Sequence, residues 1–196
     1  MTLRIYGDSR SGNCLKVKWT AEKLGLPYDW VEVDIKQGTT REPEFLTLNP
    51  AGQVPLAILE DGRALSQSNA IIMYLAEDSV LVPKDPYARA KMYEWLFWEQ
   101  YSHEPYIAVA RWQVVGMGKR VDELEPRIVQ RGTAALERLE LQLKQTPFLV
   151  EDHLSLADVA LVAYTRVAYE GGFDMDLYPA IQAWISRVDA ALRIGH

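Results

Sequence analysis

The sequence predicts a two-part chain, in which an α/β unit with the element order βαβ-α-ββα precedes an all-helical bundle. Two observations support this prediction. Strand-like runs alternate with helical repeats up to about residue 77, whereas every apolar repeat after residue 86 has helical spacing. Between them, Pro83, Asp85 and Pro86 interrupt the periodicity, as is typical of a linker. We therefore expect one domain at residues 1–77, a linker at 78–86 and a second domain at 87–196.

The first expected elements are a strand, a helix and a second strand. Residues 3–6 are rich in strand formers, residues 7–13 form a turn-prone cluster, and residues 28–33 again favour a strand. The helix between the strands has an apolar stripe at helical spacing, formed by Cys14, Val17, Ala21 and Leu24. Gly25 and Pro27 end this helix. Such a βαβ unit predicts that the two strands are parallel.

The rest of the first domain is expected to hold a short irregular helix, a hairpin and a final helix. The polar residues 37–48 favour the irregular helix, and a turn follows at 49–52. Residues 54–59 favour a strand, Asp61-Gly62 is a strong hairpin signal, and residues 63–66 are the returning strand. An amphipathic helix then contains Ala70, Ile71, Tyr74 and Leu75.

The second domain has only helical patterns. Residues 87–115 form a long aromatic-rich stretch, and apolar stripes follow within residues 136–143, 156–167 and 181–192. Before the second of these stripes, Ser155 and Asp158 form S-x-x-D, a relative of the capping box. We interpret this motif as specifying the fold.

Composition excludes several classes of protein. The net charge of −6 and the isoelectric point near 5.2 argue against a nucleic-acid binder. No run of apolar residues is long enough to span a membrane, and residues 1–5 do not resemble a secretory signal. A single cysteine, Cys14, precludes an internal disulfide and fits a reducing compartment, and the three histidines lack metal-ligand spacing. We expect a cytoplasmic protein without a metal.

Pro55 stands at the head of an apparently central strand, where proline cannot donate to the sheet ladder. An ordinary trans proline at the first position of a strand explains it, and only about 5–6% of X-Pro bonds are cis. A cis bond is the alternative, and it would leave the amide and carbonyl of Val54 available to a peptide-like ligand. The proline alone does not decide between them.

Two hydroxyl-bearing turns precede helices. Ser68 stands directly before the helix at residues 70–75, where it is either a plain N-cap or part of a site for a carboxylate. Ser9 and Ser11 precede the helix of Cys14, where they either satisfy the turn or stabilise a bound thiolate. A hydrogen bond to a charged group contributes roughly 1.5–3 kcal/mol, which would lower a thiol pKa by about one to two units.

The order of these elements resembles the glutathione transferase superfamily over essentially the whole chain, with a theta-like, serine-type appearance. The motifs that carry the resemblance are the run Asn49-Pro50-Ala51-Gly52-Gln53-Val54-Pro55, the step Gln67-Ser68-Asn69-Ala70-Ile71 and the cap at Leu154–Asp158. The resemblance implies a thioredoxin-like first domain and a homodimer. It also implies glutathione as co-substrate, with no other cofactor, and a small hydrophobic electrophile as the second substrate.

The resemblance also implies roles for individual residues. Pro55 would be a cis-proline, and Val54 would pair with the cysteinyl backbone of glutathione. Gln67 and Ser68 would hold the γ-glutamyl end, and Gln53 lies where the family often contacts the ligand. Ser11 falls on the catalytic serine of the serine-type classes, with Tyr6 as the competitor and Ser9 third. Cys14 shares the apolar stripe of its helix, so we interpret it as a buried structural thiol.

Two departures from the family pattern leave questions open. Thr39 and Thr40 stand where many theta-like members have a histidine for the glycine end of glutathione, so Arg41 or Gln53 would meet that carboxylate. The chain ends at His196, whereas longer members cover the second-substrate pocket with an extension, so we expect an open pocket.

In the long helix, Trp95, Glu99 and His103 share one face. With Tyr106 and Arg111, that face either lines the electrophile site or serves helix packing, and packing is the favoured interpretation for Trp95. The predicted function is conjugation of the glutathione thiolate to hydrophobic electrophiles, typical of detoxification. The alternatives are a glutathione-dependent isomerase or dehalogenase and a non-catalytic glutathione-binding or protein-interaction module.

Overall fold

The computed structural model describes residues 2–194. The chain divides into two compact units, Met1–Ser79 and Val80–His196. The division falls inside the expected linker at 78–86, and the first helix of the second unit begins at Pro86. Each unit is described by itself below.

The first unit has the predicted element order βαβ-α-ββα. Its elements are β1 (Leu3–Gly7), α1 (Gly12–Leu24), β2 (Tyr28–Glu32), the 3₁₀ turns η1 (Ile35–Gln37) and η2 (Thr39–Arg41), α2 (Pro43–Leu48), β3 (Leu56–Ile58), β4 (Ala64–Ser66) and α3 (Ser68–Leu75). The sheet order is β2-β1-β3-β4. β1 and β2 are parallel, as the βαβ pattern predicts, and the other pairs are antiparallel.

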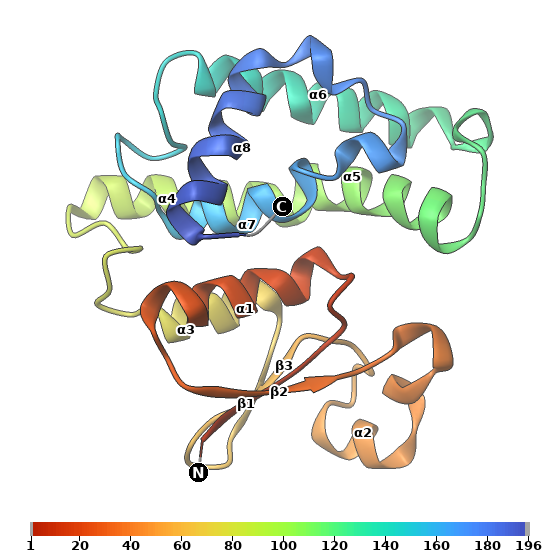
Figure 1. Ribbon diagram of the computed structural model, residues 1–196, viewed down its shortest axis with the longest axis vertical. Helices are drawn as coiled ribbons and strands as arrows, with labels where there is room; N and C mark the ends of the chain where they lie inside the picture. Colours follow the sequence, from red (N-terminus) through yellow and green to blue (C-terminus); the bar gives the residue numbers. More distant parts are fainter. Residues whose placement is uncertain (1, 195–196) are drawn as a thin grey trace. The chain divides into compact units, whose positions relative to one another are not determined.

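The two faces of this sheet are covered differently. Helices α1 and α3 lie side by side over one face, and α2 lies on the other side of the sheet (Figure 1). Gly7 faces α1, because a Cβ atom added to it would lie 3.1 Å from the Cys14 Cβ and would clash with the Trp30 ring. Since neighbouring residues of a strand point to opposite faces, Tyr6 points away from α1. Its ring meets the ring of Phe45 edge-on, with centroids 6.1 Å apart.

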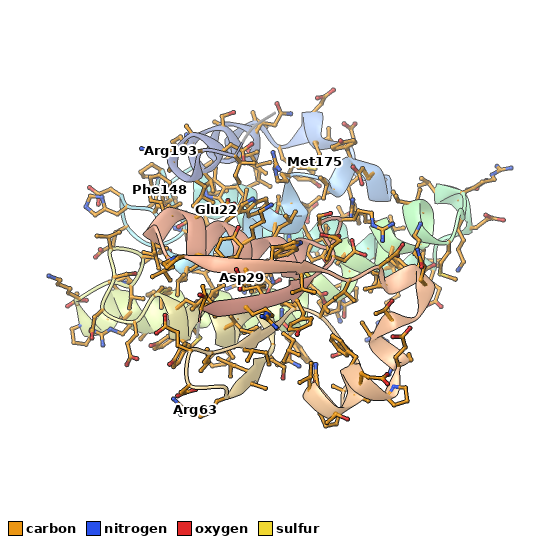
Figure 2. The ribbon with its side chains drawn as sticks, turned by 60° about the horizontal axis from the view of Figure 1, so that its bottom comes forward. Glu22, Asp29, Arg63, Phe148, Met175 and Arg193 are labelled. Atoms are coloured by element: carbon orange, nitrogen blue, oxygen red, sulfur yellow. The ribbon has the colours of Figure 1, made fainter. Side chains whose placement is uncertain are left out.

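The hairpin forms where Asp61-Gly62 predicts it, with shorter strands than expected. The Leu59 amide donates to the Arg63 carbonyl at 2.8 Å, and Gly62 takes the left-handed φ of 87° that its turn position requires. Figure 2 labels Arg63, whose side chain extends from this hairpin. The first strand of the hairpin begins at Leu56, so Val54 and Pro55 precede it.

The regular elements of the second unit are all helices within its described residues. It comprises α4 (Pro86–Trp98), α5 (Glu104–Arg111), α6 (Pro126–Leu143), α7 (Leu156–Thr165) and α8 (Pro179–Leu192). The predicted stretch 87–115 runs through α4 and α5, with π turns at Glu99–His103 and Trp112–Gly116. The short turns η5 (Val121–Glu123), η6 (Ala168–Gly171) and η7 (Met175–Leu177) complete the unit. No helix within residues 2–194 is sufficiently long and apolar to traverse a bilayer.

Helix α7 forms the centre of the second unit, and all ten of its residues are buried. The S-x-x-D motif begins it, as the sequence predicts. Asp158 accepts hydrogen bonds from the Ser155 amide and hydroxyl, both at 2.9 Å, and from the Trp184 indole at 2.8 Å. Burial raises the pKa of Asp158, and these hydrogen bonds oppose that rise.

Candidate functional site

The predicted thiol-activating residues lie in the loop that connects β1 to α1. Ser11 is the N-cap residue of α1, and its carbonyl accepts the amides of Cys14 and Leu15, both at 3.0 Å. Its half-buried side chain makes no capping hydrogen bond to the helix. The Ser11 hydroxyl therefore lies at the positive end of α1 without a structural role in capping it.

Ser9 differs from Ser11 because its hydroxyl is engaged by a carboxylate. The Ser9 amide and hydroxyl both donate to Glu32 Oε1, at 2.8 and 3.0 Å, and the Trp30 indole donates to Glu32 Oε2 at 2.6 Å. Partial burial disfavours the charged form of Glu32, but these hydrogen bonds outweigh it and lower the pKa of the carboxyl. The proton of Ser9 is thus already donated within the fold, which makes Ser9 the weaker candidate for binding a sulfur.

An ionic cluster holds the same loop, and the sequence patterns did not predict it. Asp8 is fully buried and accepts from Arg10 in a fork, Nε to Oδ1 at 2.9 Å and Nη2 to Oδ2 at 2.7 Å. The Arg10 guanidinium also contacts Asp34 at 2.7 Å, and the Ile35 amide donates to Asp8 at 3.3 Å. Burial opposes ionisation of Asp8, but the bonds from Arg10 dominate and its pKa is lowered. The only local sequence signal for this cluster was the spacing Asp8-x-Arg10. Asp34 could not be added to it from the sequence, because it lies 24 residues further along the chain.

Cys14 is confirmed as a buried thiol. Its side chain is inaccessible, and burial raises its pKa to about 11, although a hydrogen bond with the Ser11 side chain opposes the rise. At neutral pH the side chain is therefore protonated and shielded, which does not suit a redox-active cysteine. The same contact places the Ser11 hydroxyl within hydrogen-bonding reach of a sulfur atom.

The fold does not place Tyr6 near the hydroxyls of Ser9 and Ser11. Its ring packs against the cluster of Val33, Phe45 and Leu56, on the face of the sheet that α1 does not cover. The strand alternation thus separates the ring of Tyr6 from the N-terminus of α1. This placement favours Ser11 over its competitor.

The peptide bond between Val54 and Pro55 is cis, as the family resemblance implies. The turn before it is held by the buried Asn49, whose side-chain amide donates to the Gln53 carbonyl at 2.7 Å. Pro55 is buried and Val54 is half-buried, whereas the side chain of Gln53 is exposed. The backbone of Val54 thus lies beside the sheet, in front of β3.

Gln67 and Ser68 form the start of α3, whose N-cap lies one residue earlier in the chain than predicted. The prediction of Ser68 as the N-cap is wrong. The Gln67 carbonyl accepts the Ile71 amide at 3.0 Å, so Gln67 is the N-cap and Ser68 is the first helical residue. Gln67 is exposed and has a φ of 71°, which is uncommon for a residue other than glycine. Such backbone conformations cluster at functional sites.

The N-termini of α1 and α3 are tied together by a side-chain contact. The Ser68 hydroxyl donates to Asn13 Oδ1 at 3.2 Å, across 55 residues of sequence. Two positive helix ends therefore lie next to Val54, Gln67 and Ser11 in one unit, where they can bind a carboxylate or a thiolate. Within the described residues, no group of three histidine, cysteine or acidic side chains is arranged to hold a metal.

The predicted second-substrate residues lie in the second unit and have separate contacts. His103 is buried with Nε2 2.9 Å from Thr165 Oγ1, and that hydroxyl donates to the Leu161 carbonyl. Arg111 donates to Glu170 at 2.6 Å, and Tyr106 is half-buried. In this conformation His103 presents no surface to a ligand, so Tyr106 and Arg111 are the accessible members of the set.

Trp95 is a packing residue, as the favoured interpretation expects. It is buried and meets Trp98 edge-on, and the Arg138 guanidinium lies 5.0 Å from the Trp95 ring and 4.8 Å from the Trp98 ring. The cation therefore contacts both indoles, an arrangement that stabilises α4 against α6.

Comparison with known proteins gives consistent matches over both units. Residues 10–78 match the glutathione S-transferase N-terminal domain, and residues 105–191 match the glutathione S-transferase C-terminal domain. Glutathione S-transferase theta-1 of Mus musculus is 31% identical over 98% of this chain and 84% of its own. The crystal structure of a glutathione S-transferase from Pseudomonas fluorescens is 49% identical, covers 97% of this chain and 96% of its own, and has a TM-score of 0.93. A Phanerochaete chrysosporium glutathione transferase in complex with oxidized glutathione is 25% identical, covers 98% of this chain and 93% of its own, and has a TM-score of 0.87.

Proposed function

The chain belongs to the glutathione transferase superfamily, and from this premise we propose that its first unit binds glutathione and activates the thiol for attack on a hydrophobic electrophile. The observation that supports this most directly is the Ser68–Asn13 contact, which joins two helix N-termini beside the cis-proline turn. An extended tripeptide with two carboxylates and one thiol fits a site with these features.

In the proposed complex the backbone of Val54 pairs with the cysteinyl residue of glutathione. The γ-glutamyl carboxylate lies at the N-terminus of α3, where it accepts from the backbone amide of Ser68 and contacts Gln67. The strained backbone of Gln67 supports this role, because it directs an exposed amide side chain from the start of the helix.

We assign the glycine carboxylate to Arg41, with Gln53 beside it. The Arg41 guanidinium lies against the turn that leads to Val54, and its Nη1 is 3.4 Å from the Ala51 carbonyl. A Cβ atom on Gly52 would approach this Nη1 to 2.7 Å, so the glycine leaves the space that the guanidinium uses. A cation held next to Gln53 supplies the charge that the family histidine, absent at Thr39 and Thr40, would otherwise provide.

Ser11 activates the thiol by donating a hydrogen bond to the sulfur. The serine remains a donor and forms no covalent intermediate. Ser9 is bound to the carboxylate of Glu32 and Tyr6 faces the other side of the sheet, whereas the Ser11 hydroxyl stands at the N-terminus of α1, where its contact is with the protonated thiol of Cys14. A charge-assisted hydrogen bond of roughly 1.5–3 kcal/mol would lower the pKa of the bound thiol by about one to two units, from a free value near 8.5.

The test is a pH titration of the bound thiolate by ultraviolet absorbance. We expect Ser11→Ala to raise the pKa of bound glutathione by about one to two units. Ser9→Ala and Tyr6→Phe serve as matched controls and should leave it unchanged. An unchanged pKa in Ser11→Ala would show that another group activates the thiol. If calorimetry detects no affinity for glutathione in the unmodified protein, the proposed function is wrong as a whole.

Turnover distinguishes conjugation from the alternatives. A panel of electrophiles assayed with glutathione should yield conjugates, with glutathione consumed in proportion to product. Isomerase activity would form product without net consumption of glutathione, and a non-catalytic binding module would bind glutathione and convert no electrophile. Arg111→Ala and Tyr106→Phe should raise KM for the electrophile if these residues contact it, with the affinity for glutathione unchanged.

We also propose a homodimer, as the family resemblance implies, in a cytoplasmic detoxification role. Exposed aromatic side chains support an interface on α4 and the π turn that follows it, where Tyr87, Phe97 and Tyr101 are 75%, 73% and 82% exposed. Exposed aromatic side chains of this kind are enriched at protein interfaces. Light scattering should report a dimer, and Phe97→Glu should shift it towards the monomer. A monomer at high protein concentration would contradict this part of the proposal.

A further inference from the structure

The serines that begin α1 and α7 have different side chains three residues later. Ser155 is followed by Asp158, and Ser11 is followed by Cys14. The side chains of an N-cap residue and of the third helical residue lie together, which is the geometry of a capping box. At α7 this pairing is present, since the Ser155 hydroxyl donates to Asp158 Oδ2 at 2.9 Å. At α1 the Ser11 side chain makes the corresponding hydrogen bond with the Cys14 thiol.

The partner determines what each serine hydroxyl can still do. A serine hydroxyl carries one proton and two acceptor lone pairs. Asp158 Oδ2 takes the proton of Ser155, so that hydroxyl has none left to donate. A neutral thiol carries a proton of its own. Cys14 can therefore donate to the Ser11 oxygen and leave the proton of Ser11 for another acceptor.

The surroundings of Cys14 keep its sulfur protonated. Its side chain is inaccessible to solvent, and burial raises its pKa to about 11. The carboxylates of Asp8 and Glu32 lie near enough to oppose a negative charge on this sulfur. The Asp8 backbone also makes a hydrogen bond to the sulfur, and since this bond favours the charged form, the amide is its donor. The sulfur thus already accepts one hydrogen bond and keeps its proton for the Ser11 oxygen.

The fold holds Cys14 in place under the serine. The Cys14 amide donates to the Ser11 carbonyl at 3.0 Å, within the first turn of α1. A Cβ atom added to Gly7 would lie 3.1 Å from the Cys14 Cβ, so β1 runs directly against this side chain. A donor fixed in this way favours one of the three staggered rotamers of Ser11 over the other two.

We propose that Cys14 is a positioning residue, whose thiol donates to Ser11 Oγ and thereby directs the Ser11 proton to the sulfur of bound glutathione. The inference rests on the proposed function, because it takes Ser11 as the activating residue. A thiolate is a stronger acceptor than a neutral thiol, so the Ser11 proton points to the bound sulfur and the Cys14 proton points to Ser11. Cys14 itself contacts no substrate, and no covalent bond changes.

The first test compares Cys14→Ala with Cys14→Ser by titrating bound glutathione. The two replacement side chains are of similar size and leave similar cavities, but only serine has a proton to donate. We expect Cys14→Ala to raise the pKa of the bound thiol by about half a unit, since three rotamers of Ser11 dilute the productive one about threefold. Cys14→Ser should restore the unmodified value. An equal rise in both variants, or no rise in Cys14→Ala, would overturn the proposal.

A double variant shows whether Cys14 acts through Ser11. Ser11→Ala combined with Cys14→Ala should titrate as Ser11→Ala alone does, because a positioning residue has no effect once the group that it positions is gone. Val17→Ala, which removes a buried side chain from the same stripe of α1, is the matched control for lost packing and should leave the thiol pKa unchanged. Additive effects in the double variant would mean that Cys14 does not act through Ser11, which contradicts the assigned role.

A measurement on the unmodified chain tests the hydrogen bond without any glutathione. Cys14 is the only cysteine in the sequence, so the S–H stretching band in the infrared spectrum belongs to it. We expect this band at a lower frequency than in Ser11→Ala, because donating a hydrogen bond weakens the S–H bond. The same frequency in both proteins would refute the role of Cys14.

The two proposals fail in different ways. If Ser11→Ala raises the pKa of the bound thiol and Cys14→Ala does not, only the role of Cys14 is wrong and the proposed function stands. If the unmodified protein has no affinity for glutathione, the proposed function is wrong, and the role of Cys14 falls with it.

Discussion

The two ends of the first unit share the same helices and strands but differ in the partial charge that the helix termini place there. At one end α1 and α3 begin, with Ser11 and Ser68 at their N-termini. At the other end both helices finish beside a cavity that Glu60 and Glu77 border. Because a helix carries partial positive charge at its start and partial negative charge at its end, parallel packing makes one end suit anions and the other cations. Helix direction, which the net charge of −6 does not reveal, sets the sign of the backbone partial charge at each end.

The largest expected effect comes from breaking the serine-loop end at Asp8. Asp8→Ala should lower the free energy of unfolding by about 3 kcal/mol, because it leaves Arg10 and the Ile35 amide without their buried acceptor. Urea unfolding followed by circular dichroism measures this. Asp34→Ala is the matched control, and it should cost much less than Asp8→Ala because that pair is partly exposed. Equal losses would show that burial of Asp8 is not what holds the loop.

The second prediction separates strain from binding at the start of α3. Gln67→Gly should raise the free energy of unfolding by about 1 kcal/mol, since glycine adopts a positive φ freely, and should weaken glutathione binding. Asp78→Gly, beside the opposite end of the unit, also relieves a positive φ, here of 60°. It should stabilise the fold and leave glutathione affinity unchanged. A loss of glutathione affinity in both variants would remove the distinction between the ends.

Acid should weaken the serine-loop end through protonation of Asp8. The folded pKa of Asp8 lies below its unfolded value, so its contribution is complete above about pH 3.9 and is lost as the pH falls towards the folded pKa. We therefore expect Asp8→Asn to show a shallower loss of stability than the unmodified protein between about pH 4 and pH 2.5. Urea midpoints measured across that range test the sign. A parallel pH dependence of the two proteins would contradict it.

The smallest expected effects concern coupling between the two ends, which we expect to be absent. Glu77→Gln should change the free energy of unfolding by less than about 0.5 kcal/mol, because the side chain is exposed. The same variant should leave the affinity for glutathione unchanged, because Glu77 lies at the opposite end of the unit from Ser11 and Ser68. Calorimetry with glutathione measures this. A changed affinity would mean that the two ends are coupled.

Local patterns predicted most of the elements around the site. The sequence allowed us to predict the apolar stripe of α1, the Asp61-Gly62 turn and the order of the strands. Helical and strand periodicities depend on residues close in sequence, so local patterns reveal them. The isomer of the Val54–Pro55 bond could not be predicted from the proline alone. The family resemblance implied the cis bond. The start of α3 was misplaced by one residue, because a hydroxyl at Ser68 looks like a cap, whereas a positive φ at Gln67 leaves no sequence signal.

By itself, the sequence determined the two-unit organisation, the superfamily, and the set of hydroxyls and turns from which a thiol-binding site can be built. The tertiary structure alone decided that Ser9 is engaged by Glu32, that Asp8 and Asp34 share Arg10, and that Ser68 meets Asn13. These contacts join residues separated by 23, 24 and 55 positions, so no local pattern encodes them. The same holds for the cavity at the other end of β1, since its walls come from four separate segments that only the packed sheet and helices bring together.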